Sequence, residues 1–282
     1  MKIKTILKSI WNEFIYGGHL QSLGASAVIF VSCFLSNIKF SWDIFLVSYL
    51  VFYSLYLYNY YKEIEIDKFT NYQRTEYLKK YIKNAPLIIF LIFLVVSLLV
   101  FIFGKFSGFI FVFLIFLFGF LYSFVFKRVT KRVPLFKNFY VSAFFSAMVF
   151  LPKVYYSVPI LVLPTLVLAI FIFLKAFLMQ ILLDLKDVET DKKMGLLTLP
   201  SLLGEKRTIT VLKIFSFLLT SIFLIIFCVF LHLFPPNVLV WLFGIPFNFL
   251  CYYLAEKKDY TAYILGSGEF FLLGVLILIT LI

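Results

Sequence analysis

The sequence predicts an all-α integral membrane protein with about nine transmembrane helices. Its 282 residues are 63% hydrophobic and only 14% charged, whereas a soluble domain carries about 25% charged residues. Apolar runs of about 20 residues, the length that crosses a bilayer as a helix, recur from one end of the chain to the other. The basic residues gather in alternate loops, which is the pattern of a polytopic membrane protein.

Each span is expected where an apolar run lies between polar or turn-forming residues. The fifth run is shorter than the others. No stretch is long and polar enough to form a separate soluble domain, so residues 1–282 are interpreted as a single transmembrane domain. The predicted spans are residues 14–36, 41–61, 86–104, 108–126, 138–152, 158–183, 209–231, 237–254 and 262–282.

The N-terminal residues 1–14 have a composition of their own. Apolar side chains recur there at helical spacing, and Lys2, Lys4 and Lys8 lie between them. This pattern predicts a helix that lies in the membrane interface before the first span. A simple positively charged flank is an equally good interpretation.

The basic residues also predict the orientation. With the N-terminus in the cytoplasm, 22 of the 26 Lys and Arg residues fall on the cytoplasmic side, and only Lys39, Lys105 and Lys153 fall on the opposite side. We therefore expect a multi-pass protein of the cell membrane whose N-terminus and acidic motifs are cytoplasmic. The net charge of +12 follows from this topology, and it does not indicate a nucleic-acid partner.

Two heptapeptides repeat one pattern 124 residues apart. Residues 62–68 and residues 186–192 both read Lys, acid, any residue, Glu, any residue, Asp, Lys. The chain has 14 carboxylates, and seven of them lie in these segments once Asp184 is counted. One such segment alone would be interpreted as solvated loop acids. Two, each at the end of an apolar run, predict a cation site between the spans.

The spacing of the acids places them on helix faces. Asn59, Glu63 and Asp67 are separated by four residues each, so they line one face of a helix. Asp187 and Asp191 repeat this spacing in the second segment. Glu65 and Glu189 are expected to point away from these faces, because they lie two residues out of phase.

The second segment extends towards the membrane. Gln180 is expected on the face of Asp187, with Asp184 beside it. Together the two faces offer about five oxygen ligands, which carry too much negative charge to stay unneutralised. Oxygen ligands without His or Cys favour Mg²⁺. Because Mg²⁺ completes its coordination with water and phosphate oxygens, the sequence predicts a phosphorylated substrate at the membrane surface.

The loop between the fourth and fifth predicted spans is strongly basic. Five cations occupy eleven positions, namely Lys127, Arg128, Lys131, Arg132 and Lys137. Such a loop could bind the diphosphate of a substrate whose tail lies in the bilayer. A positive-inside loop without a binding role is the other interpretation.

These motifs resemble those of the UbiA family of intramembrane prenyltransferases. The family has an Asn-x-x-x-Asp-x-x-x-Asp motif after the second span, which residues 59–67 match, and a second Asp-rich motif, which residues 184–191 match. Residues 195–204 supply the Gly-x-x-Thr-Leu-Pro-x-x-x-Gly sequence that follows, before a new helix expected near Glu205. Residues 122–138 match in their Tyr-Ser, Lys-Arg and Lys-Asn pairs. The resemblance covers nearly the whole chain.

The resemblance implies a UbiA-like bundle around a central cavity. It also implies Mg²⁺-dependent transfer of a prenyl group from a prenyl diphosphate to an aromatic, quinone-precursor or lipid acceptor, by ionisation of the diphosphate and capture of the carbocation. The implied metal ligands are Asn59, Glu63, Asp67, Asp184, Asp187 and Asp191. The implied diphosphate contacts are Lys127, Arg128, Lys137 and Asn138. The implied catalytic residues are Asp67, Asp191, Lys127 and Tyr122.

The chain departs from the family pattern at four places, one of which is the Tyr-to-Lys spacing of the basic loop, one residue longer than the tight form of the family. Glu63 stands where Asp is usual, and Leu183 stands where many members have Asn. The first span begins Tyr-Gly-Gly-His at residues 16–19, where many relatives have an Arg-Pro pair. His19 could replace that contact, but a role in helix packing is the preferred interpretation.

Two charges lie within predicted spans, at Lys175 and Glu269. Charges inside a membrane are functional candidates by default, and these two are also candidates to pair with each other. Two alternatives to an enzyme stay open, namely a non-catalytic isoprenoid-binding relative and a cation-coupled transporter. Against a transporter, the acids lie at one membrane face and no discontinuous span is evident near the midplane.

Overall fold

The computed structural model describes residues 2–68, 71–122, 129–159 and 162–282, and every regular element in these ranges is a helix. The elements are α1 (Lys2–Tyr16), α2 (His19–Leu35), α3 (Trp42–Asp67), α4 (Tyr72–Leu78), η1 (Ile82–Asn84), α5 (Ala85–Phe103), α6 (Phe106–Leu121), α8 (Phe136–Ala147), η3 (Met148–Phe150), α9 (Leu151–Tyr156), α10 (Leu163–Asp184), α11 (Val188–Met194), α12 (Leu199–Leu203), α13 (Glu205–Ile222), η4 (Phe223–Phe230), η5 (Pro236–Phe243), α14 (Gly244–Glu256), α15 (Thr261–Ser267) and α16 (Glu269–Ile279).

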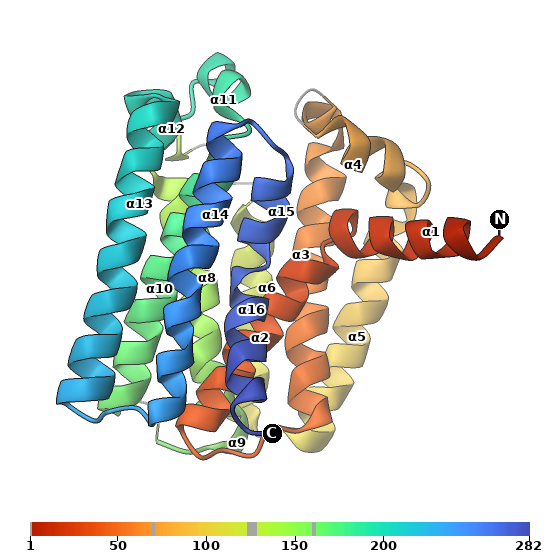
Figure 1. Cartoon of the computed structure of the whole chain (residues 1–282). Helices are drawn as coiled ribbons and strands as arrows, with labels where there is room; N and C mark the ends of the chain where they lie inside the picture. Colours follow the sequence, from red (N-terminus) through yellow and green to blue (C-terminus); the bar gives the residue numbers. More distant parts are fainter. Residues whose placement is uncertain (1, 69–70, 123–128, 160–161) are drawn as a thin grey trace.

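The long helices stand side by side along one axis (Figure 1). The short helices α4, α11 and α12 lie at one end of this bundle, and α9 lies at the other. Asp67 closes α3 and Asp184 closes α10 at the first of these ends, which we call the motif end. Both acidic motifs therefore lie at the same face of the bundle, as the alternation of predicted spans requires.

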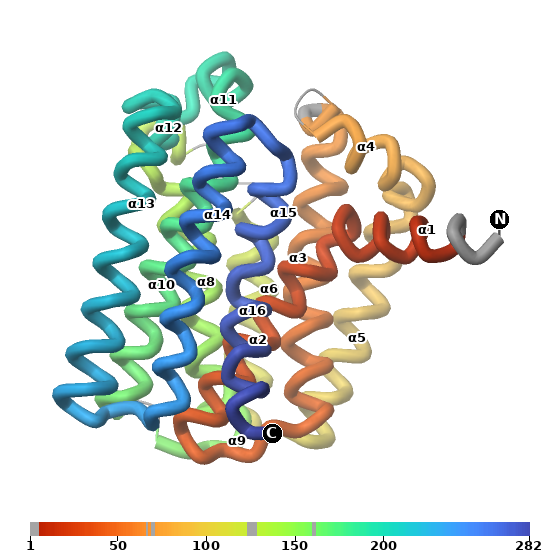
Figure 2. Tube along the Cα trace, in the orientation of Figure 1, coloured from red at the N-terminus to blue at the C-terminus, as the bar shows by residue number. Residues whose placement is uncertain are grey.

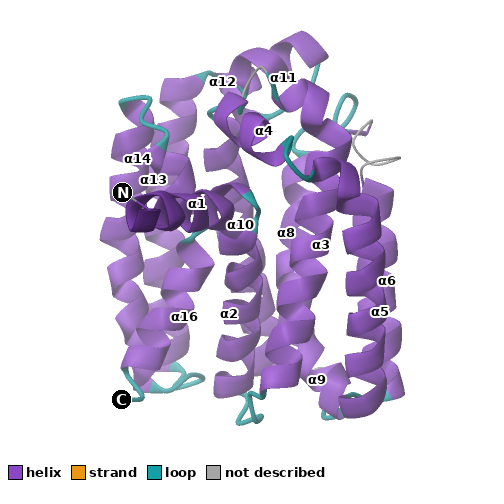
Figure 3. Cartoon of the chain, turned by 90° about the vertical axis from the view of Figure 1, so that its right-hand side faces the viewer, coloured by secondary structure: helices purple, strands orange, loops and turns teal. Residues whose placement is uncertain are grey.

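The centre of the bundle is formed by α2, α3, α8 and α10, with α5 and α6 on one side and α13 and α14 on the other (Figure 3). The closest packing joins α10 to α8, α2 to α16, and α2 and α5 to α3. Most of the hydrophobic core lies between these helices, in one cluster that includes Val47, Phe145, Phe171 and Trp241. The helices of the centre thereby hold both motifs on a packed scaffold.

In the described part of the chain, five helices are long and apolar enough to cross a membrane, or up to seven if each of two bent pairs counts as one span. Helix α6 is apolar but has only 16 residues. Helix α3 is longer than predicted, because it continues through the first motif to Asp67 and includes the polar end of the segment. The chain is thus a multi-pass helical protein, and the count of nine spans stays a prediction.

Helix α5 shows how the bundle meets the bilayer. Its buried residues Ile89, Ile92, Val96 and Val100 follow helical spacing and face the neighbouring helices. The opposite face is equally apolar but exposed, with Phe101 at 81% exposure. An apolar outer face is expected of a helix whose backbone groups are satisfied internally and whose surroundings are lipid.

The first predicted span is bent. Helices α1 and α2 meet at 62°, and α1 runs across the bundle instead of along it (Figure 2). Gly18 permits this elbow, because its φ of +89° is costly for any residue with a Cβ and a Cβ there would lie 3.1 Å from Cβ of Tyr56. The apolar side chains of Trp11 and Ile10 on α1 are 60% and 61% exposed. An amphipathic N-terminal helix is present, and its interfacial position stays a prediction.

The second motif does not continue one helix. Helix α10 ends at Asp184, and the backbone turns there, since the Asp187 amide donates to the Asp184 carbonyl (3.0 Å) before α11 begins at Val188. The expectation that Gln180 and Asp187 share one helix face is therefore wrong. A new helix begins at Glu205, as predicted.

Candidate active site

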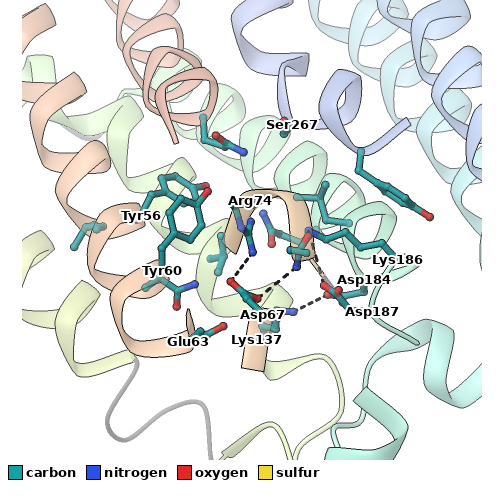
Figure 4. Close-up of a pocket in the computed structure, with 18 of the residues that line it drawn as sticks. Tyr56, Tyr60, Glu63, Asp67, Arg74, Lys137, Asp184, Lys186, Asp187 and Ser267 are labelled. Carbon is teal, nitrogen blue, oxygen red and sulfur yellow. Dashed lines mark hydrogen bonds and ion pairs between the residues drawn. The ribbon is translucent and has the colours of Figure 1, made fainter. Parts of the chain in front are cut away.

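A cavity of about 260 Å³ opens at the motif end between α3, α8 and α10. Its lining includes Asn59, Glu63 and Asp67 from the first motif. Opposite them are the acids of the second motif (Figure 4). The turn after α10 returns these acids to the cavity even though the helix itself has ended. The lining residues of the second motif are Gln180, Asp184, Asp187 and Asp191.

The first motif lies on the last turns of α3, and the i, i+4, i+8 spacing predicts its face correctly. Asp67 is 7% exposed and accepts a hydrogen bond from Arg74 Nη2 at its Oδ2 (2.7 Å). Asn71 Nδ2 donates to its Oδ1 (3.4 Å). Asn59 Oδ1 is buried and has no hydrogen-bond partner among the described residues. Such an orphaned buried oxygen is costly unless a ligand satisfies it.

In the second motif, Asp184 is 1% exposed and engages both of its oxygens. Lys137 Nζ donates to Oδ1 (2.8 Å) and Asn138 Nδ2 donates to Oδ2 (2.6 Å). Lys137 lines the cavity, but Asn138 is fully buried and is not among the lining residues. Asn138, which the resemblance assigns to the diphosphate, is thus placed to hold Asp184, and Lys137 alone of this pair faces the cavity.

Of the other two acids of this motif, Asp187 directly precedes α11 and Asp191 lies on it. Asp191 accepts a hydrogen bond from Thr198 Oγ1 (3.0 Å), which fixes the Thr-Leu-Pro segment against the motif. Asp187 Oδ1 is buried without a hydrogen-bond partner in the described part of the chain. Glu189 is exposed, as its helical phase predicts, and Glu65 is also exposed and paired with Lys68.

Cations lie between the two motifs (Figure 4). Lys186 Nζ donates to Asn71 Oδ1 (3.1 Å) and lies 4.0 Å from Asp187 Oδ2, so it connects the segment after the first motif with the second. Arg74 also lies 4.4 Å above the ring of Tyr60. No sequence motif assigns a role to Arg74, Asn71, Lys186 or Tyr60. Lys186 carries the only signal, because it belongs to the repeated pattern.

Burial sets the electrostatics of this site. It raises the pKa of Asp191 to about 6, and the nearby Lys137 opposes that rise. It lowers the pKa of Lys186, and the Asp187 carboxylate opposes that fall. Both pKa shifts have the same cause, because burial away from water destabilises the charged form of each side chain. The site is therefore suited to a ligand that brings compensating charges of both signs.

The donor set fits Mg²⁺. It consists of carboxylate and amide oxygens, and two of these, Asn59 Oδ1 and Asp187 Oδ1, lack a partner in the described residues. The expected convergence of about five oxygen ligands is not found, however, because no three His, Cys, Asp or Glu side chains in the described ranges come close enough to enclose a metal ion. Mg²⁺ commonly uses one or two carboxylates and shares phosphate oxygens and water, so the arrangement suits an ion that arrives with a phosphorylated ligand.

The basic loop before α8 is tied to the second motif by the backbone. The Leu197 amide donates to the Thr130 carbonyl (3.2 Å), and the Leu135 amide donates to the Leu197 carbonyl (2.9 Å). Lys131 and Arg132 are exposed. Two predicted diphosphate contacts, Lys127 and Arg128, lie outside the described residues. Tyr122, also predicted, lines the cavity, and its ring stacks on Tyr140 with 5.2 Å between centroids.

His19 does not line the cavity. Its Nδ1 lies 2.5 Å from the Tyr49 hydroxyl and its Nε2 lies 3.1 Å from Glu13 Oε1. Glu13 also accepts hydrogen bonds from the hydroxyls of Tyr77 (2.9 Å) and Tyr81 (3.0 Å). This network fastens α1 to α2, α3 and α4, which agrees with the preferred interpretation of His19 as a packing residue.

Comparisons with known proteins agree with this geometry. A family model described as the UbiA prenyltransferase family matches residues 23–275. No curated protein matches the chain. The apo structure of a UbiA homolog from Aeropyrum pernix K1 is similar in fold, with a TM-score of 0.71 at 14% identity over 93% of this chain and 98% of that one.

Two further solved structures have this fold. A UbiA homolog from Archaeoglobus fulgidus, bound to DMAPP and Mg²⁺, has a TM-score of 0.59 at 14% identity and covers 94% of this chain and 98% of its own. A digeranylgeranylglyceryl phosphate synthase has a TM-score of 0.57 at 18% identity and covers 96% of each chain. The family match spans most of the sequence, and the chain therefore belongs to the UbiA prenyltransferase family.

Proposed function

We propose that this protein is a Mg²⁺-dependent intramembrane prenyltransferase. It transfers a prenyl group from a prenyl diphosphate to a hydrophobic or aromatic acceptor, such as a quinone precursor or a lipid. The observation that carries the proposal is the pair of acidic motifs facing each other, with cations between them, across a cavity whose lining is otherwise largely apolar. The UbiA homolog bound to DMAPP and Mg²⁺ supports the choice of donor.

Mg²⁺, when bound, supplies positive charge to the diphosphate oxygens as the allylic C–O bond breaks. The residues proposed to hold it are Asn59, Glu63, Asp67, Asp187 and Asp191. Asp67 and Asp191 are the two most enclosed of these, which is why we propose them as catalytic. Asp184 is proposed as a positioning residue, since Lys137 and Asn138 engage both of its oxygens.

The chain's own cations hold the leaving diphosphate in this proposal. Lys137, Lys186 and Arg74 line the cavity and bring positive charge to its motif end. Lys127 and Arg128 are proposed to add to them on the evidence of the sequence motif alone. Tyr122 lines the same cavity and is proposed to lie near the reacting carbon. The acceptor captures the allylic cation and then loses a proton, so no protein nucleophile is required.

Pyrophosphate release from the purified protein in lipid tests the proposal. Geranyl, farnesyl and geranylgeranyl diphosphates are offered with a membrane extract as acceptor source, in Mg²⁺ or in EDTA. We expect release that requires Mg²⁺ and is lost in Asp191→Asn. Glu189→Gln is the matched control, because Glu189 belongs to the same motif but is exposed. Donor binding without release in any condition would support the non-catalytic alternative, and failure to bind any donor would refute both.

We further propose that residues 1–282 form one domain whose motif end and N-terminus are cytoplasmic, with α1 in the membrane interface. The three cysteines are buried, so a cysteine introduced at exposed Lys192 can be labelled selectively. An impermeant maleimide should label Lys192→Cys in lysed cells and not in intact ones. Equal labelling of intact cells would reverse the orientation.

A further inference from the structure

The cavity continues from the motif end into the membrane part of the bundle. Below Asn59 its lining becomes apolar and comes mainly from α3 and α8. We call this part the apolar arm. Its side chains are Phe52, Leu55, Val141, Phe144 and Phe145. The five side chains of the arm carry no charge, whereas the motif end above them is lined by acids and cations.

Three aromatic rings from three helices close the end of the apolar arm. Phe52 of α3 meets Phe145 of α8 in an edge-to-face contact, and Phe145 stacks on Phe270 of α16, each with 5.1 Å between ring centroids. The rings are 3%, 1% and 2% exposed. Phe270 does not line the cavity, so it lies behind Phe145. Helix α2 closes the space behind Phe270, because a Cβ at Gly24 would lie only 3.5 Å from Phe270 Cβ.

The depth of the arm follows from helix geometry. Lys137 and Phe145 both line the cavity from α8, and their separation of eight positions corresponds to about 12 Å along the helix. On α3, the seven residues from Asn59 to Phe52 correspond to about 10 Å. The two walls therefore agree on the distance from the ligands of the diphosphate to the aromatic floor.

The side of the arm near the motif end is bridged. The Tyr140 hydroxyl of α8 donates to the Phe118 carbonyl of α6 (2.8 Å), and the Tyr140 ring stacks on Tyr122. This contact spans the gap between α6 and α8 next to the diphosphate site. It closes this side of the arm, so a chain bound in the arm does not leave between α6 and α8.

We propose that Phe145, supported by Phe52 and Phe270, is the residue that limits the length of the prenyl donor. An isoprene unit adds four chain bonds of about 1.5 Å, or roughly 5 Å when extended. An arm of 10–12 Å thus accommodates two units, and a third only when the chain folds. This inference rests on the proposed function, and it names geranyl and farnesyl diphosphates as the donor class and geranylgeranyl diphosphate as too long.

The test measures binding of thiolodiphosphate analogues with two, three and four isoprene units, in Mg²⁺, to the full-length protein in lipid nanodiscs. These analogues do not react, so no acceptor is needed. We expect the four-unit analogue to bind wild type at least tenfold more weakly than the two-unit analogue. In Phe145→Ala this difference should fall to threefold or less, because the floor recedes. Val141→Phe, which fills the arm, should exclude the three-unit analogue as well.

Phe171→Ala is the matched control. Phe171 is a buried ring on α10 that packs on Phe223 and Trp241, and it does not line the cavity. The Phe171→Ala variant loses a core ring but leaves the arm unchanged. Its preference for analogues of a given chain length should therefore equal that of wild type. If Phe145→Ala does not fold, Phe145→Leu gives a smaller shift in the same direction.

Equal binding of all three analogues by wild type, with no change in Phe145→Ala or Val141→Phe, would overturn the proposal, because the chain would then leave the bundle sideways. A shift in Phe171→Ala as large as in Phe145→Ala would also overturn it. Absence of Mg²⁺-dependent binding by every analogue in wild type would instead refute the proposed function, so the two failures are distinguishable.

Discussion

Lys175 and Glu269 form an ion pair inside the bundle, between the middle of α10 and the first residue of α16. They are 2% and 5% exposed. The pair lies next to the 54° bend between α15 and α16, and α15 supplies Tyr263 and Ser267 to the wall of the cavity. The pair thus fastens a broken helix to the helix that carries the second motif.

Removing one partner should destabilise the protein strongly. Lys175→Met leaves Glu269 charged and unpaired in an apolar place, which typically costs about 3–5 kcal/mol. The double variant Lys175→Met with Glu269→Leu should recover most of this loss, because well-packed apolar residues can replace a buried pair. Thermal unfolding in detergent measures both. Lys213→Met is the control, since Lys213 pairs with Glu256 at the surface and should cost below about 1 kcal/mol.

Lys186 should matter more for donor binding than for folding. Its ammonium lies between Asn71 and Asp187, and a charge-assisted hydrogen bond to a phosphate oxygen contributes about 1.5–3 kcal/mol. We therefore expect Lys186→Met to raise the KM for the donor by about tenfold or more. Lys192→Met, at an exposed position of the same pattern, should leave KM unchanged. Equal effects of both variants would mean that only the general positive charge matters.

Asp191 should make the stability of the protein in EDTA depend on pH. Burial raises its pKa from 3.8 to about 6, so the folded state binds this proton more tightly than the unfolded state does. The resulting stabilisation is fully present below about pH 4 and is lost as the pH rises through 6, with a size of at most about 3 kcal/mol. The melting temperature of the Asp191→Asn variant should not show this fall in stability between about pH 4 and pH 6. Identical pH profiles of the two proteins would contradict the assignment.

Gly18 and Gly195, two of the three glycines with a positive φ, distinguish the backbone strain that a side chain would cause from its steric clash. Gly195→Ala meets no atom within 4 Å, so it should cost only the backbone strain of its φ of +67°, about 1–2 kcal/mol. Gly18→Ala adds a contact of 3.1 Å with Tyr56 Cβ, and it should cost more and displace α1. Chemical denaturation of both variants checks the order. A larger loss in Gly195→Ala would be the contrary result.

The sequence predicted the parts of the site that depend on one helix. The face of Asn59, Glu63 and Asp67 follows from periodicity, because α3 is continuous through the motif. The pairing of Lys175 with Glu269 was also foreseen as one option, since an unpaired charge is costly in a membrane.

The remaining parts depend on contacts between segments, which periodicity does not contain. The helix ends at Asp184, although no Gly or Pro marks that point in the sequence. Arg74 reaches Asp67 across a turn and from a different helix. Asn138 does not line the cavity, because its side-chain amide donates a hydrogen bond to Asp184. In the last two cases a tertiary hydrogen bond decides the position of the side chain.

The cations between the motifs have a consequence for the catalytic cycle. Among the described residues, five carboxylates line the cavity, and three basic side chains balance most of their charge. The acids are Glu63, Asp67, Asp184, Asp187 and Asp191, and the bases are Arg74, Lys137 and Lys186. In the proposed reaction, a pocket that compensates its own charge would keep its shape when pyrophosphate departs together with its counterions. The site would then return to a resting state that is already assembled, and the next donor would need only to exchange partners with side chains that are in place.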